Sequence, residues 1–153
     1  MRRKPMVQGT VRGGILLLLC AFAVLGLVCT AQAETVIQVT LEDASDPGVN
    51  GMKMSARPNV VSAGTVRIDA ENRSKNLVHE VIVTPWSDRL LPHDNAGQRV
   101  IESRIKILGE VDDLKPGAHG SVTVNLAPGA YLLFCNQPSH YRAGMWTRVV
   151  AGR

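Results

Sequence analysis

The chain has 153 residues, of which 45% are hydrophobic, 20% charged and 4% aromatic, and its formal net charge is +4. This length suits one domain, or one domain behind a targeting segment, and argues against a multidomain enzyme. The hydrophobic fraction excludes a disordered chain. Because no apolar run is long enough to be read safely as a membrane span, a polytopic membrane protein is excluded as well.

Residues 1–33 have the pattern of a secretory signal peptide. Residues 2–4 are basic, an apolar run follows over residues 15–28, and small side chains stand at Ala31 and Ala33. This pattern predicts cleavage after residue 33 and a periplasmic or otherwise extracytoplasmic location. The alternative is that the segment stays uncleaved as a membrane anchor, which is the only membrane association expected.

The predicted domain, residues 34–153, is electrically neutral. Residues 1–33 hold four of the 17 lysines and arginines and none of the 13 acidic residues. The positive charge of the whole chain is therefore no sign of a nucleic-acid partner. The domain keeps one of three cysteines, Cys135, so it has no internal disulfide. A lone thiol exported to an oxidising compartment is open to oxidation unless it is bound by a ligand such as a metal ion.

Short strands dominate the predicted secondary structure. Alternating or β-branched runs with turn signals between them indicate an all-β sandwich of seven or eight strands. In chain order, the expected strands cover residues 36–41, 52–56, 65–70, 79–84, 110–114, 121–126, 131–135 and 145–150. Proline and glycine mark the turns at residues 46–48, 63–64, 115–117 and 127–129.

One segment, residues 86–107, does not fit the strand pattern. Its apolar residues stand among polar ones without strict alternation. We expect a long excursion that contains a helical turn or more. Excursions of this length are often functional or cover another part of the fold.

Four residues form the candidate metal site: His79, Cys135, His140 and Met145. The last three have the spacing C-x4-H-x4-M, and they surround the loop between the last two expected strands. His79 opens another expected strand, 56 positions before the cysteine. One loop would thus supply three ligands, and a neighbouring strand would supply the fourth.

These residue types suit copper in both of its common oxidation states. A thiolate and two imidazoles bind Cu(I) and Cu(II), and a weak axial thioether tunes the potential. Taken singly, each residue has a simpler structural interpretation, as a buried thiol, a loop histidine or a core methionine. Together, at this spacing, they predict a single copper ion and electron transfer.

The sequence resembles the cupredoxins, the small type 1 copper proteins, over nearly all of residues 34–153. The C-x4-H-x4-M spacing is most similar to that of the rusticyanin, sulfocyanin and auracyanin types. The resemblance implies a Greek-key β-sandwich, one copper held by His79, Cys135, His140 and Met145, and electron transfer without enzymatic turnover. It also implies a monomer with transient redox partners, which dock on an apolar rim around His140 formed by Pro138, Tyr141 and Ala143.

The chain departs from the family at the residue after the first histidine ligand. Many cupredoxins have Asn or Ser there, whereas this chain has Glu80. The two remaining histidines, His93 and His119, read as turn or loop residues outside the metal site.

Two other functions remain open from the sequence. A copper carrier would use the same ligands, and Met52 and Met54 could then add a soft pair for Cu(I), although core packing explains them as well. The other hypothesis is a metal-free sandwich that acts as an interaction module.

Overall fold

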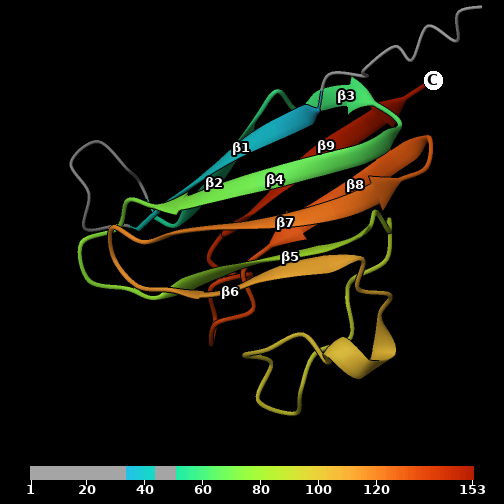
Figure 1. Cartoon of the computed structure of the whole chain (residues 1–153). Coiled ribbons are helices and arrows are strands. Elements are labelled where there is room, and N and C mark those ends of the chain that lie inside the picture. Colours follow the sequence, from blue (N-terminus) through green and yellow to red (C-terminus); the bar gives the residue numbers. More distant parts are fainter. Residues whose placement is uncertain (1–33, 44–50) are drawn as a thin grey trace, which may run out of the picture. The chain divides into compact units, whose positions relative to one another are not determined.

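The computed structural model describes residues 34–43 and 51–153, which form nine strands in two sheets (Figure 1). The segment predicted as a signal peptide lies outside the described residues. Within the described part, no helix is long and apolar enough to span a membrane. In chain order the strands are β1 Thr35–Glu42, β2 Lys53–Arg57, β3 Val60–Ser62, β4 Gly64–Asn72, β5 His79–Pro85, β6 Gly109–Leu114, β7 His119–Leu126, β8 Gly129–Phe134 and β9 Trp146–Gly152.

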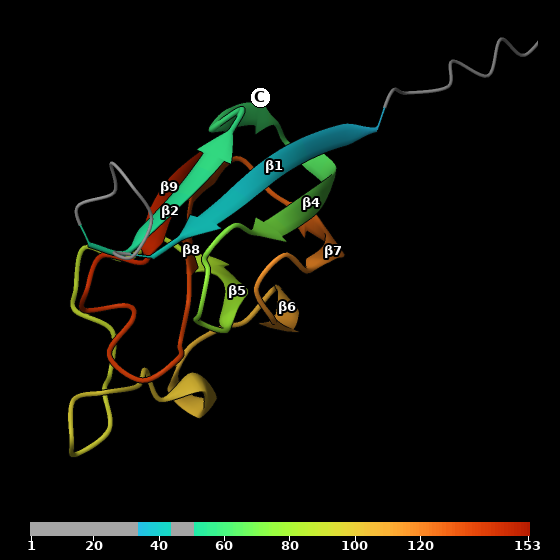
Figure 2. The ribbon, with the colours of Figure 1, turned by 90° about the vertical axis from the view of Figure 1, so that its left-hand side faces the viewer.

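The two sheets pack face to face as a sandwich (Figure 2). The four-stranded sheet has the order β2-β1-β4-β7, and the five-stranded sheet has the order β3-β9-β8-β5-β6. β1 pairs with β4 in parallel, and so does β3 with β9, whereas the other neighbouring strands are antiparallel. Strands far apart in the chain therefore lie side by side, and the predicted all-β sandwich is confirmed.

All eight expected strands are present, and the excursion is found between β5 and β6 with one short 3₁₀ turn, Glu102–Arg104. Two details were wrong. The short strand β3 was not expected, and it pairs with the end of β9. The sequence predicts that Cys135 ends one strand and Met145 begins the next, but β8 ends one residue before the cysteine and β9 begins one residue after the methionine.

The main hydrophobic core lies between the sheets. Strand alternation directs one face of each strand inward, as with the fully buried Ile68 of β4 and Leu133 of β8. Met54 belongs to this core and is 4% exposed, while the partly buried Met52 packs against it. Both methionines are therefore packing residues in this fold.

Two glycines let β6 approach β7 closely along one side of the sandwich. A Cβ atom on Gly109 would lie 2.5 Å from a methyl of Val124, and one on Gly120 would lie 2.5 Å from a methyl of Val111. At such distances a side chain at either position would displace the valine side chains or the strands. Glycine at both positions therefore allows the edges of the two sheets to meet closely.

A second, smaller apolar cluster covers the outer face of the five-stranded sheet. Ile82, Leu132 and Phe134 point away from the main core, and Leu91 and Val100 of the excursion pack on them. We call residues 86–108, between β5 and β6, the cover segment. It buries apolar sheet surface, so it is a packed part of the fold.

Candidate metal centre

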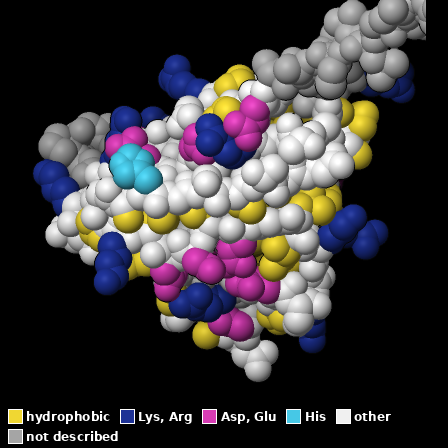
Figure 3. Space-filling view, in the orientation of Figure 1, with side chains coloured by type: hydrophobic (Ala, Val, Ile, Leu, Met, Phe, Trp, Pro, Cys, Tyr) yellow, Lys and Arg dark blue, Asp and Glu magenta, His cyan; other side chains and the backbone are white. Residues whose placement is uncertain are grey.

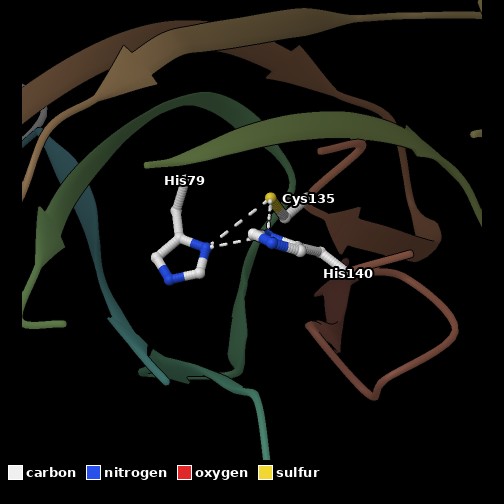
Figure 4. Close-up of side chains that lie close together, drawn as sticks. All are labelled: His79, Cys135 and His140. Atoms are coloured by element: carbon white, nitrogen blue, oxygen red, sulfur yellow. Dashed lines mark hydrogen bonds between the residues drawn. The ribbon is translucent and has the colours of Figure 1, made fainter. Parts of the chain in front are cut away.

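His79, Cys135 and His140 converge at one end of the sandwich, and all three are buried (Figure 4). The Nδ1 atoms of the two histidines lie 3.1 Å apart. The Cys135 Sγ lies 3.4 Å from His140 Nδ1 and 3.8 Å from His79 Nδ1. A metal ion could be held by these three side chains, whose ligand atoms all lie within 4.8 Å of one another.

The separations fit a metal ion bound by all three atoms. A point equidistant from the two nitrogens and the sulfur lies about 2.0 Å from each, whereas metal–nitrogen and metal–sulfur bonds in proteins measure about 2.0 and 2.3 Å. Three buried donors of one thiol and two imidazoles are also a donor set suited to copper. The donors are therefore spaced for coordination and not merely near one another.

The ligand loop, residues 135–145, is closed by backbone hydrogen bonds between its ends. Cys135 N–H donates to Met145 C=O, and Met145 N–H donates to His140 C=O, each at 3.0 Å. Met145, five positions after His140, is fully buried. This closure brings the backbone of all three predicted loop ligands together.

A polar brace fixes the chain just before His79. Asn72, which ends β4 and is fully buried, donates through Nδ2 to the carbonyls of Leu77 and Leu114 at 2.8 and 2.7 Å. Its Oδ1 accepts from both the backbone N–H and the hydroxyl of Ser74. Because Leu114 is also the register partner of His79 on β6, the brace holds the start of β5 in place.

Glu80, the departure from the family pattern, sits at an irregularity in β5. The pairing register of β5 with β6 shifts between His79 and Val81, and all residues from 79 to 84 are buried. Such bulges re-aim side chains beside functional sites. Here Glu80 Oε1 accepts a hydrogen bond of 2.9 Å from the backbone N–H of Asn136. The carboxylate thus ties the residue after the first histidine to the residue after the cysteine.

Burial dominates the titration of the site in the absence of metal. It raises the pKa of the Cys135 thiol to about 12, although backbone N–H groups of Gln137 and Glu80 donate to the sulfur and act in the opposite direction. Burial and the charge of Arg99 lower the pKa of His140. The metal-free site is therefore an uncharged thiol beside a neutral imidazole at neutral pH.

An acidic group lies on the outer surface next to the site, where Figure 3 shows acidic side chains gathered over the β6 side of the molecule. Asp112 and Asp113 of β6 are exposed, and Gln137 of the ligand loop donates to Asp113 Oδ1 at 2.6 Å. Burial raises the pKa of Glu80 to about 7, and the charges of Glu110 and Asp113 add to this rise. The acidic group therefore acts electrostatically on the buried carboxyl.

The other two histidines lie outside the cluster. His93 is in the cover segment, where its Nδ1 lies 2.7 Å from the Leu91 carbonyl oxygen. His119 was expected in a turn, but it begins β7 and is exposed. Its place in a strand follows from pairing with Glu71 of β4, which a local pattern does not reveal.

Sequence reasoning missed the role of Asn136. This residue is 2% exposed, and its side chain bonds to the cover segment at residues 100 and 102. A polar residue directly after a buried apolar run was the available signal. Its partners could not be inferred because they lie 34 to 36 positions away in the chain.

No protein-family model and no curated protein matches the sequence. Among solved structures, the chain is similar to reduced auracyanin from Roseiflexus castenholzii, with 17% identity, a TM-score of 0.55, and coverage of 80% of this chain and 100% of that one. Rusticyanin from Thiobacillus ferrooxidans is 15% identical with a TM-score of 0.55, and the match covers 78% of this chain and 79% of that one. Auracyanin B is 20% identical with a TM-score of 0.54, and the match covers 80% of this chain and 92% of that one. The chain therefore has the cupredoxin fold, as its sequence predicted.

Proposed function

We propose that this chain is an exported type 1 copper protein that carries single electrons between redox partners. His79, Cys135, His140 and Met145 would hold one copper ion, and copper bound there supplies a Cu(II)/Cu(I) couple. The single observation that carries the proposal is the convergence of Cys135 Sγ and the two Nδ1 atoms within 3.8 Å of one another in a buried site. Rusticyanin, a structural neighbour, was itself described as a copper protein.

The surrounding residues suit electron transfer without turnover. All three converging side chains are at most 8% exposed, so water and substrates are kept from the metal position. The closed ligand loop and the Asn72 brace fix the donors from two directions. A site that holds one geometry in both oxidation states needs little rearrangement when an electron moves, and no enzymatic step is part of the proposal.

The loop histidine offers the route for the electron. His140 is the most exposed of the three converging residues, at 8%, against 0% for His79 and Cys135. Exposed Pro138 and Ala143 and half-buried Tyr141 lie beside it in the chain. We infer that partners dock there transiently through a small apolar contact. The neutral charge of residues 34–153 implies weak long-range steering, and the protein is expected to act as a monomer.

The copper-carrier alternative receives less support. In that alternative Met52 and Met54 could add a soft pair for Cu(I), but both pack in or against the main core. Buried donors also oppose rapid transfer of the metal to another protein. We therefore prefer the electron-transfer function. Fast exchange of bound copper would instead favour the copper carrier.

The test begins with the full chain, expressed in a bacterium and recovered from the periplasm. The mass of the recovered protein, measured by mass spectrometry, shows whether cleavage occurs before Glu34. After addition of one equivalent of Cu(II), we expect an intense thiolate-to-copper band in the visible spectrum and a narrow copper hyperfine splitting in EPR.

The matched control is Cys135→Ser, which should bind copper without the intense band. Met145→Leu should keep the band but raise the reduction potential, since it removes a weak axial ligand. A colourless wild-type protein with ordinary Cu(II) parameters would contradict the proposal.

A further inference from the structure

The cover segment is attached to the ligand loop by a group of short polar contacts. Figures 1 and 2 both show the segment (yellow) beside the loop that joins β8 to β9. Asn136, the residue after Cys135, makes most of these contacts. Its Oδ1 accepts from Val100 N–H at 2.6 Å, and its Nδ2 donates to Val100 C=O at 3.0 Å and to Glu102 Oε1 at 2.7 Å. The amide thus pairs with the Val100 backbone as a neighbouring strand would.

The backbone of Asn136 is bonded as well. Its N–H donates to Glu80 Oε1 at 2.9 Å, and its C=O accepts from Arg99 Nη1 at 3.0 Å. Every polar group of this residue has a partner, although the residue is only 2% exposed. Three separate parts of the chain, namely β5, the cover segment and the ligand loop, therefore meet at Asn136.

Further contacts run along the ligand loop from this point. Ser139 N–H donates to the Gln98 carbonyl at 2.8 Å, and Arg142 Nη1 donates to the Gly97 carbonyl at 3.3 Å. Ser139 has a positive φ of 68°, which an L residue adopts at a cost and which the surrounding contacts must maintain. The loop conformation is therefore held from outside by the cover segment.

We propose that Asn136 is a positioning residue that locks the cover segment onto the ligand loop. The lock fixes Cys135 and His140 for coordination and controls how fast copper enters and leaves the site. This inference rests on the proposed function for its copper readouts, but the lock itself is a property of the metal-free chain.

The chemistry of the contact requires an amide. Alanine removes three hydrogen bonds and leaves the Val100 backbone groups buried without their partners. Aspartate keeps an acceptor for Val100 N–H but directs a carboxylate at Val100 C=O and at Glu102. Unpaired buried polar groups and facing carboxylates are both unfavourable. The lock should therefore open more often in both variants.

The first test uses limited trypsin cleavage of the full-length, metal-free protein. Arg99 lies in the cover segment, and a protease needs that segment locally unfolded before it can cut there. We expect cleavage after Arg99 to be at least about tenfold faster in Asn136→Ala and Asn136→Asp than in wild type, by the loss of buried hydrogen bonds. Gln137→Ala is the matched control, because it removes one exposed contact from the same loop, and its rate should stay within about twofold.

A second variant separates the specific contact from a general loss of stability. Adding Glu102→Gln to Asn136→Asp exchanges the donor and the acceptor, so that an amide faces the new carboxylate. We expect this double variant to recover part of the protection against trypsin. A cleavage rate that equals that of the single Asn136→Asp variant would show that the pair does not interact.

The copper readouts follow in the same set of variants. In Asn136→Ala, release of copper to a chelator should be at least about tenfold faster, and the thiolate-to-copper band should shift or broaden. If the wild type shows the band and Asn136→Ala has unchanged trypsin cleavage, band and release rate, the lock is refuted while the proposed function stands. If the wild type shows no band, the proposed function fails, and faster trypsin cleavage of the variant still supports the lock.

Discussion

The carboxylate of Glu80 accepts a hydrogen bond of 2.9 Å from the backbone N–H of Asn136, which joins the residue after His79 to the residue after Cys135. This bond spans the two sequence regions that supply the converging donors. An acceptor oxygen is what the bond requires, and a carboxylate, a protonated carboxyl or an amide can each provide one. Glu80, where this chain departs from the family pattern, therefore makes a structural contact.

The first prediction compares two substitutions at Glu80. Glu80→Gln keeps an acceptor for Asn136 N–H, whereas Glu80→Ala leaves this buried donor unpaired. We expect Glu80→Ala to lower the unfolding free energy of the metal-free protein by about 1–3 kcal/mol, and Glu80→Gln to lower it by clearly less. Urea unfolding at pH 8 measures both. Equal losses in the two variants would show that the hydrogen bond is not the stabilising contact.

The second prediction concerns the pH dependence of stability in the metal-free protein. Burial raises the pKa of Glu80 from 4.5 to about 7 in the folded state. Between these values the unfolded chain has lost the proton and the folded chain keeps it, so stability falls as pH rises. The contribution is complete below pH 4.5 and is lost once the pH passes about 7.

Unfolding in urea at a series of pH values from 5 to 8 tests this sign. The unfolding free energy of wild type minus that of Glu80→Gln should decrease with rising pH. Only the wild type loses the contribution of the Glu80 proton, because the amide does not titrate. A difference that stays constant over this range, or increases, would contradict the raised pKa.

The third prediction concerns the brace before His79. Asn72→Ala should lower the unfolding free energy by about 3 kcal/mol, since it removes the donor to the buried Leu114 carbonyl and the acceptor of the buried Ser74 N–H. The matched control is Asn76→Ala in the same loop, where the side chain is exposed and the change should stay within about 0.5 kcal/mol. Chemical denaturation of the metal-free proteins measures both. Similar stabilities for the two variants would mean that the brace contributes nothing.

Local patterns were sufficient for most strands and for the two loop residues that converge, Cys135 and His140. The alternation of β4, with Val66, Ile68 and Ala70 facing inward, is visible in six consecutive residues and needs no partner. The C-x4-H-x4-M spacing is equally local, and the ligand loop closes on itself through Cys135 and Met145. Features of this kind depend on neighbours in the chain, which a single sequence displays.

The missed features depend on partners far away in the chain. β3 has three residues and exists because it pairs with Val150, Ala151 and Gly152 at the end of β9. Asn136 is important because residues 99 to 102 return to it, after an excursion with no regular pattern. Neither pairing leaves a period in the sequence, so both became visible only in the folded arrangement.

The last prediction follows from the protonated thiol of the metal-free site. Because the pKa of Cys135 is about 12, the sulfur carries its proton at pH 8 and must lose it to bind a metal. His140, whose pKa is lowered by burial, is already neutral and releases none. Addition of one equivalent of Cu(I), under argon in weakly buffered solution at pH 8, should therefore release about one proton per copper. A pH indicator or a pH-stat measures the release, and Cys135→Ser should abolish it while leaving the fold intact. A wild-type protein that binds Cu(I) without proton release would show that the thiol is not a ligand.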